Sequence, residues 1–162
     1  MITLWELKGK QGRRYSAYSW RTKMALKHKG LEYESIPVLM GDKETIAFSG
    51  GNSVPIIKDG EKVVRDSWTI AEYLEDRYSS KATLFAGDIG RGVTHAFNTW
   101  VDRALIGTMM PVIVCDLHQR VDPGDDAYFR QRFEGFLQST LEQAREQEPK
   151  ALDRLQRALE PM

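Results

Sequence analysis

A run of hydroxyl side chains near the N-terminus has the residue types needed to orient or activate a small ligand. Ser16, Tyr18 and Ser19 fall where a strand is expected to turn into a helix. A helix N-terminus exposes unpaired N–H groups and the positive end of the helix dipole, so a hydroxyl there can help to hold an anionic group. Taken alone, Ser16 is also an ordinary helix cap, because serine is a preferred residue at that position.

Two further segments have residues suited to binding. Val54-Pro55 stands at the entrance of a predicted strand, where proline removes a hydrogen-bond donor from the sheet. A cis bond there would turn the Val54 backbone outward, toward an extended peptide. Asp66-Ser67 precedes a helix whose N-terminus can hold a carboxylate. Each segment has a simpler structural explanation, as an edge proline and as a cap, but we expect all three at one end of one sheet.

The elements expected around these segments are a strand at 2–7, a helix capped by Ser16 or Ser19 and ended by Gly30, and a strand at 31–39. Residues 54–58 and 61–65 flank Asp59-Gly60, a pair typical of a type I′ hairpin turn. A helix with Ser67 as its cap follows. A βαβ unit followed by a ββα unit predicts a mixed four-stranded sheet covered by helices.

The second half of the chain has helical periodicity only. Apolar residues at helical spacing predict a helix near 97–104 that Gly107 or Pro111 kinks or ends. A single amphipathic helix is expected over 129–144, and Pro149 suits the first turn of a last helix. The change of pattern places a domain boundary near residues 80–90.

Composition excludes several classes of protein. The 162 residues are 41% apolar and 28% charged, with 23 basic and 23 acidic side chains, which is typical of a globular protein and argues against a general nucleic-acid binder. The longest apolar run, 109–115, is too short to span a membrane, and residues 1–10 lack a signal sequence, so we expect a cytoplasmic protein. With Cys115 alone and three scattered histidines, we expect no disulfide and no metal site.

Charge is unevenly distributed along the chain. Residues 1–30 contain eight basic side chains and one acidic side chain, Glu6. This balance is compatible with an anionic small ligand near the N-terminus. The simpler interpretation is a solvated basic face, which we prefer on charge alone.

The three segments together resemble the glutathione S-transferase family. The resemblance rests on Ser16-x-Tyr18-x-Trp20-Arg21-Thr22-Lys23-x-Ala25-Leu26-x-His28-Lys29-Gly30, Val54-Pro55 and Asp66-Ser67-Trp68-x-Ile70-Ala71-Glu72-Tyr73-Leu74. It is specific over residues 1 to about 85, weaker beyond, and greatest for the serine-type branch of bacterial β-etherases and related fungal enzymes. It implies an α/β thioredoxin-like, glutathione-binding domain at 1–85 and an α-helical domain at 86–162.

The resemblance also implies roles for individual residues. Ser16 would be the hydroxyl that activates the glutathione thiol, with Tyr18 second and Tyr15 as a further rival donor. Val54 would pair through its backbone with the cysteinyl part of glutathione, beside a cis Pro55. Asp66 and Ser67 would hold the γ-glutamyl part.

The chain departs from the family pattern in two places. The residue after the catalytic serine is usually proline in this branch and is Ala17 here, which constrains the turn less. Family members also have a later helix opened by a Ser/Thr-x-x-Asp capping box, whereas Ser139-x-x-Glu142 falls inside the predicted helix at 129–144. The helical domain is therefore expected to be incomplete.

The implied activity is transfer of glutathione to a small electrophile, with an aryl ether as one substrate class and glutathione as the only co-substrate. The alternative is a module of the same fold that binds glutathione or a protein without turnover. A nucleic-acid-associated scaffold would need to bind through the basic N-terminal third. Because the apolar stripe at 129–141 is expected to lack a covering element, we expect a homodimer.

Overall fold

The computed structural model describes residues 1–160, and the chain divides into two compact units, Met1–Gly92 and the residues from Val93 onward. The first unit is a thioredoxin-like α/β domain and the second is helical, which confirms the predicted fold class. The division of function between 1–85 and 86–162 remains a prediction. One helix, α3, begins in the first unit and continues into the second.

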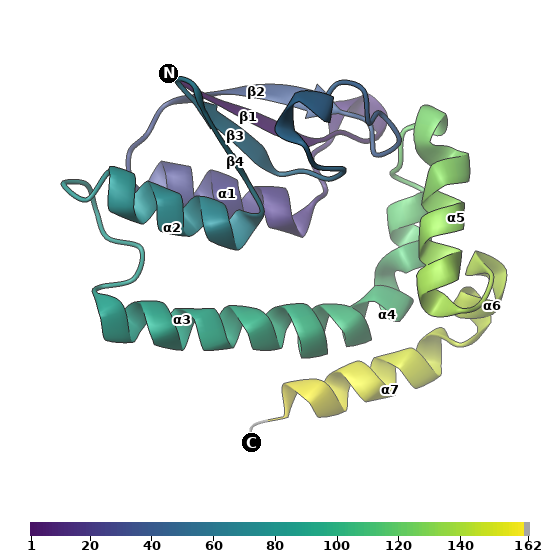
Figure 1. Cartoon of the computed structure of the whole chain (residues 1–162). Coiled ribbons are helices and arrows are strands. Elements are labelled where there is room, and N and C mark those ends of the chain that lie inside the picture. Colours follow the sequence, from purple (N-terminus) through teal and green to yellow (C-terminus); the bar gives the residue numbers. More distant parts are fainter. Residues whose placement is uncertain (161–162) are drawn as a thin grey trace. The chain divides into compact units, whose positions relative to one another are not determined.

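The first unit contains a four-stranded mixed sheet and two helices that lie side by side on one face of it (Figure 1). Its elements are β1 (Ile2–Leu7), α1 (Ala17–His28), β2 (Tyr33–Val38), β3 (Ile56–Asp59), β4 (Lys62–Arg65) and α2 (Ser67–Arg77). The strand order is β2-β1-β3-β4, with β1 parallel to β2 and antiparallel to β3. Short 3-10 turns occupy Lys10–Gly12 and Ala47–Ser49.

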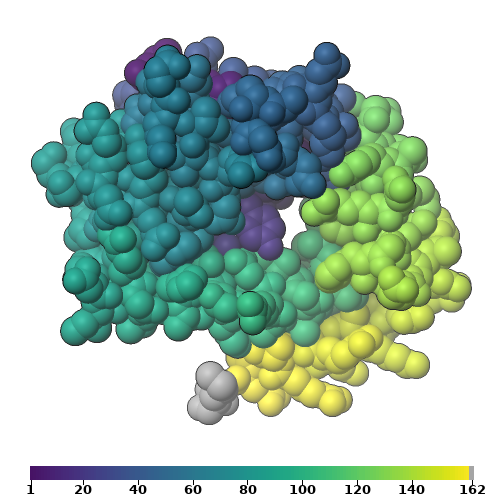
Figure 2. All heavy atoms as spheres, in the orientation of Figure 1, coloured from purple at the N-terminus to yellow at the C-terminus, as the bar shows by residue number. Residues whose placement is uncertain are grey.

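The period-two pattern of β1 explains which face the helices cover. Ile2 and Leu4 are buried with Ile57 and Val64 of the neighbouring strands, and they pack against buried residues of α1 and α2. Trp5 faces the other side, where it packs with a smaller cluster that includes Ile56. The segment 41–53, drawn in blue, belongs to the surface of this unit (Figure 2).

The hairpin turn is one residue later than predicted. Asp59 pairs with Lys62, so Gly60 and Glu61 form the loop, and Gly60 has a φ of 57° whereas Glu61 is not among the residues with positive φ. A type I′ turn needs positive φ at both central residues, so this is not one. The carboxylate of Asp59 instead accepts hydrogen bonds from the hydroxyls of Tyr73 and Tyr78, at 2.9 and 2.6 Å.

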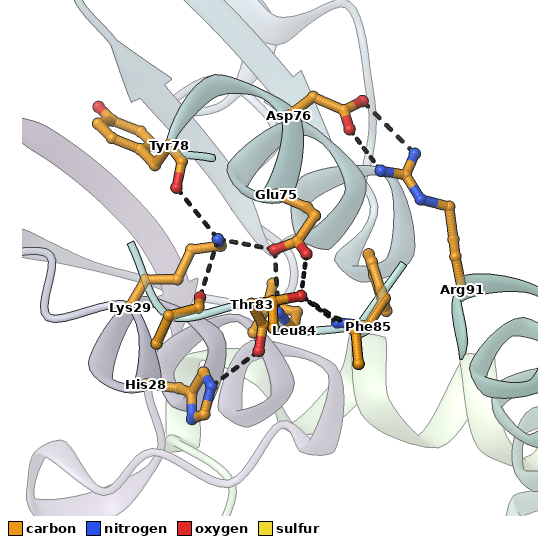
Figure 3. A network of polar contacts seen from close by, with 11 residues as sticks. His28, Lys29, Glu75, Asp76, Tyr78, Thr83, Leu84, Phe85 and Arg91 are labelled. Atoms are coloured by element: carbon orange, nitrogen blue, oxygen red, sulfur yellow. Dashed lines mark hydrogen bonds and ion pairs between the residues drawn. The ribbon is translucent and has the colours of Figure 1, made fainter. Parts of the chain in front are cut away.

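The C-terminal ends of α1 and α2 are joined by a buried ion pair (Figure 3). Lys29, which is 2% exposed, lies 2.7 Å from the carboxylate of Glu75 and donates to the carbonyl oxygens of Tyr78 and Ala82 at 3.3 and 3.0 Å. Glu75 also accepts from the Thr83 hydroxyl and from the Leu84 N–H. Burial raises the pKa of Glu75, but these hydrogen bonds and the charge of Lys29 outweigh it and lower the pKa to about 2.

The second unit is helical, and α4 packs against each of the helices that follow it. The helices are α3 (Asp88–Trp100), a π-helical turn at Val101–Leu105, α4 (Ile106–His118), α5 (Asp126–Leu137), α6 (Leu141–Glu146) and α7 (Glu148–Leu159). Neither Gly107 nor Pro111 ends a helix, because both lie inside α4, so that half of the prediction is wrong. That one of them kinks the helix stays a prediction. Pro149 lies in the first turn of α7, as predicted.

The predicted single helix over 129–144 is two helices in the structure. α5 ends where Gln138 takes a φ of 53°, and α6 begins after Thr140. Thr140 and Gln143 form a capping box, in which the Thr140 hydroxyl accepts from the Gln143 N–H at 3.2 Å and the Gln143 side chain accepts from the Thr140 N–H at 3.0 Å. The expectation that this region lies inside one helix is therefore wrong. Within residues 1–160, no helix is both long and apolar enough to cross a membrane.

Candidate functional site

The sheet register brings the three polar segments to one end of the first unit. Trp5 of β1 is aligned with Ile56 of β3, and Ile56 is aligned with Arg65 of β4. Neighbouring strands lie about 4.8 Å apart. The loop that leads to Ser16 leaves the sheet at this end, Val54-Pro55 enters it here, and Asp66-Ser67 follows β4 here (Figure 1).

Ser16 is the N-cap of α1. Its backbone is extended, with φ −74° and ψ 117°, and its Oγ accepts a hydrogen bond from the Ser19 N–H at 3.2 Å. Because the oxygen is the acceptor in this contact, the hydroxyl proton remains available to a second partner. The half-buried Ser16 side chain therefore combines a hydroxyl donor with the positive end of the helix dipole.

Tyr18, the second candidate activator, belongs to the first turn of α1. Its side chain is 37% exposed, and the guanidinium of Arg21 lies 5.0 Å from the centre of its ring. The phenol ring therefore packs along the surface of the helix, whereas Ser16 lies at its end.

Val54 and Pro55 stand directly before β3. The peptide bond between them is cis, as the resemblance implies. Pro55 is buried, and Val54 packs beside the small cluster of Val38, Ile46 and Ile56. Val54 takes part in no strand pair of the described sheet, so its peptide groups lie outside the ladder.

Asp66, not Ser67, is the N-cap of α2, which corrects the predicted cap. The Asp66 Oδ1 accepts from the N–H groups of Trp68 and Thr69, at 3.1 and 3.0 Å. Asp66 has a φ of 70° and a ψ of 131°, which lies outside the left-handed α region in which aspartate is enriched. Ser67 becomes the first helical residue and is 5% exposed. Its N–H is left at the helix end, where N–H groups have no intrahelical acceptor.

A fourth group of residues lies beside this site and was missed as a functional element. Glu6 is 1% exposed and forms ion pairs with Arg14, in the loop before Ser16, and with Lys23 of α1. The only signal in the sequence was that Glu6 is the single acidic residue among eight basic ones in residues 1–30.

Cys115 is not placed to act as a reactive thiolate. Its Sγ donates to the Leu141 carbonyl oxygen at 3.2 Å, and burial raises the pKa of the thiol. A raised pKa keeps the thiol protonated at neutral pH. In the part of the chain that the structure describes, no group of three or more His, Cys, Asp or Glu side chains is arranged to hold a metal ion.

Comparison with known proteins identifies the family. Residues 12–82 match the glutathione S-transferase N-terminal domain, and residues 92–162 match the glutathione S-transferase C-terminal domain. The chain therefore belongs to the glutathione S-transferase family.

Individual relatives share part of their length with this chain. A zeta-class glutathione S-transferase of Euphorbia esula is 30% identical over 122 residues, which are 72% of this chain and 54% of that relative. The glutathione S-transferase Z2 of Arabidopsis thaliana is 43% identical over 74 residues, which are 43% of this chain and 33% of that relative. This chain thus spans about half or less of the length of these curated relatives.

Solved structures share the fold. A glutathione S-transferase of Ceriporiopsis subvermispora in complex with glutathione has a TM-score of 0.88 at 21% identity, over 97% of this chain and 70% of that one. The β-etherase LigF of Sphingobium sp. strain SYK-6 has a TM-score of 0.67 at 19% identity, over 95% of this chain and 68% of that one. At these identities the likeness establishes the fold only.

Proposed function

We propose that this protein is a serine-type glutathione transferase, which binds glutathione at the sheet end formed by β1, β3 and β4. The observation that carries the proposal is the contact at Ser16, whose oxygen accepts the Ser19 N–H and whose proton stays available at the start of α1. Family membership and a relative solved in complex with glutathione support glutathione as the ligand.

Each part of the tripeptide has a proposed partner. The peptide groups of Val54 pair with the cysteinyl backbone, beside the buried ring of Pro55. The Ser67 N–H receives the γ-glutamyl carboxylate, and the Asp66 carboxylate lies beside the γ-glutamyl amino group. The two helix N-termini, of α1 and α2, both favour an anionic ligand.

The chemical task of the site is to ionise a thiol. A free thiol with a pKa near 8.5 is only a few per cent thiolate at neutral pH, and the thiolate is the nucleophile. A hydroxyl donor and a helix dipole that lower this pKa by about two units favour the anion by roughly 2.7 kcal/mol. The displaced proton leaves to solvent, the sulfur forms a bond to an electrophilic carbon, and the leaving group departs with its electron pair.

The substrate class we propose is a small electrophile with an anionic leaving group. For an aryl ether with a neighbouring ketone, the leaving group is a phenolate, which becomes a phenol after protonation. Resemblance of the three polar segments to the β-etherase branch supports this class. Release of phenol from such an ether, measured against conjugation of a simple aryl halide, distinguishes it from a general transferase.

Replacement of Ser16 by alanine tests the proposal. We expect Ser16→Ala to raise the pKa of the bound thiol by about one to two units and to lower the conjugation rate about 10-fold to 100-fold. Glutathione affinity at neutral pH should fall by no more than about fivefold, the loss that weaker thiolate stabilisation alone causes, because Val54, Asp66 and Ser67 are untouched. Ultraviolet titration of the bound thiolate gives the pKa directly.

Tyr18→Phe is the matched control, since it also removes one hydroxyl from the same turn. If Tyr18→Phe raises the thiol pKa and Ser16→Ala does not, tyrosine is the activator. If the bound thiol of the unaltered protein keeps the pKa of free glutathione, the protein is the non-catalytic binding module.

A homodimer and a cytoplasmic location complete the proposal. Sedimentation across a range of protein concentrations tests the first, and a monomer at all of them contradicts it. Fractionation of the source cells tests the second.

A further inference from the structure

The single acidic residue of the basic N-terminal region lies in the interior of the first unit. Glu6 follows Ile2 and Leu4 on the helix-covered face of β1 and is 1% exposed. A buried carboxylate is costly unless it is paired and hydrogen-bonded. Its position therefore depends on the groups that surround it.

Three side chains from different elements converge on the Glu6 carboxylate. Lys23 Nζ of α1 lies 3.3 Å from Oε1 and 3.2 Å from Oε2, and Arg14 Nε lies 3.2 Å from Oε1. The Ser35 hydroxyl of β2 donates to Oε1 at 2.6 Å. Glu6 thus links the loop before Ser16 to both the sheet and the helix.

Arg14 is held a second time, through its backbone. The Trp20 Nε1 donates to the Arg14 carbonyl oxygen at 3.0 Å, and Lys23 Nζ lies 4.2 Å from the centre of the Trp20 ring. Glu6, Arg14, Trp20 and Lys23 therefore form a closed set of contacts, which we call the Glu6 cluster. The cluster fixes both the side chain and the backbone of the residue two positions before Ser16.

We propose that Glu6 is a positioning residue for thiol activation, which acts on Ser16 through Arg14. This inference rests on the proposed function of Ser16. Glu6 does not contact the thiol; it holds the loop 13–16 so that the hydroxyl proton of Ser16 points away from Ser19 and toward the ligand. Trp20 holds the same loop from the helix side.

Glu6→Gln separates positioning from charge because the two effects have opposite signs. Removing the negative charge leaves Arg14 and Lys23 uncompensated, and extra positive charge stabilises a thiolate, so a charge effect lowers the pKa of the bound thiol. Loss of loop position misdirects the Ser16 donor and raises that pKa. We expect a rise of about half a unit to one unit and a fall of about 10-fold in kcat, with KM for glutathione within about twofold. A fall in the thiol pKa overturns the inference.

Matched variants guard against a merely structural effect. Arg14→Gln and Lys23→Gln each remove one cation at 3.2 Å from the same carboxylate, but only Arg14 belongs to the loop, so we expect the larger loss of kcat from Arg14→Gln. Equal losses contradict an action through Arg14. Glu75→Gln alters the other buried ion pair of this unit, and we expect it to leave thiol ionisation unchanged. Arg14, whose side chain is 23% exposed, also provides a test if Glu6→Gln does not fold.

A double-mutant cycle distinguishes failure of this inference from failure of the proposed function. If Glu6 acts through Ser16, Glu6→Gln has little further effect in the Ser16→Ala background. Additive effects overturn the inference and leave the role of Ser16 intact. If Ser16→Ala alone leaves the thiol pKa unchanged, the proposed function itself fails.

Discussion

The two ends of the layer formed by α1 and α2 use buried charge in different ways. At the C-terminal end, Lys29 and Glu75 meet at 2.7 Å, and every donor of the Lys29 ammonium group has an acceptor. At the N-terminal end, Glu6 is shared between Arg14 and Lys23, and Ser16 retains a hydroxyl proton. At the C-terminal end all hydrogen bonds of the buried ammonium group are made and stabilise the fold, whereas at the N-terminal end the Ser16 hydroxyl remains available to donate to a ligand.

This difference follows from what each charge is paired with. The partners of Lys29 include two backbone carbonyls, those of Tyr78 and Ala82, whose positions are set by the backbone of the segment 78–82 (Figure 3). The partners of Glu6 are side chains, two of them long and flexible. A region that must adjust to a ligand is expected to rely on contacts between flexible side chains rather than on a charge whose hydrogen bonds are all made to fixed groups.

The largest effect is expected from breaking the ion pair at the C-terminal end. Lys29→Met keeps most of the buried volume but leaves the Glu75 carboxylate without its cation. Removing one partner of a buried pair costs about 3 kcal/mol or more. Chemical denaturation should show this loss, while the pKa of bound glutathione thiol should stay unchanged. A loss below about 1 kcal/mol would mean that the two ends do not differ as described.

Acid should weaken the same end next. The pKa of Glu75 is lowered to about 2, so its contribution is present above the unfolded value near 4.5 and is lost as the pH falls through 2. The shift corresponds to a contribution of about 3 kcal/mol. Between about pH 5 and about pH 2, which spans the unfolded and folded pKa values of Glu75, the free energy of unfolding should decline less steeply in Glu75→Gln than in the unaltered protein. Parallel declines would contradict the assignment.

A smaller effect is expected at the N-terminal end of α2. Asp66→Ala removes the oxygen that accepts the N–H groups of Trp68 and Thr69, and loss of such a cap costs about 1 kcal/mol. Asp66→Asn keeps an oxygen acceptor for both N–H groups on a side chain of the same shape, so it should retain most of the stability. Thermal unfolding of the three proteins gives the comparison, and equal losses in both variants would show that the charge matters more than the cap.

The smallest effect is a gain. Ala17 is the first residue of α1, where proline is favoured, and the extended backbone of Ser16 suits a residue before proline. Ala17→Pro should stabilise the protein by about 0.5 kcal/mol. It should also make the N-terminal end of the helix layer more rigid, and so more like the C-terminal end. A lower melting temperature would show that the loop 13–16 needs the freedom that alanine allows.

Local signals predicted much of the first unit and less of the second. Strand β1 and the end of α1 follow from patterns within a few residues, and the structure confirms them. The sequence left Ser16 and Ser19 as alternatives for the cap, and the structure selects Ser16. The cap of α2 was predicted one residue too late, because Asp and Ser have similar preferences for the N-cap position. The hairpin loop was predicted one residue too early, because Asp59-Gly60 is itself a typical turn pair. The break after Gln138 was missed although Thr140-x-x-Gln143 is a capping-box sequence, because the apolar spacing continued across it.

The three polar segments of the candidate site were predicted to meet at one end of one sheet, and the strand register brings them there. A ligand at the start of α1 could be inferred from the residue types at positions 16, 54–55 and 66–67 and from their order along the chain. The burial of Glu6 and Lys29 was not foreseen, since both fit the interpretation of a solvated charged surface. Burial of a charge depends on partners elsewhere in the chain, such as Arg14 for Glu6 and Glu75 for Lys29.

The sequence by itself determined the βαβ and ββα order of the first unit, the hydroxyl at the start of α1 and the excess of positive charge in the first thirty residues. Only the tertiary structure decided which cations are neutralised and which end of the helix layer remains open. The physical reason is that periodicity and capping are local properties, whereas the cost of burying a charge is set by whichever distant groups the fold brings within a few ångströms.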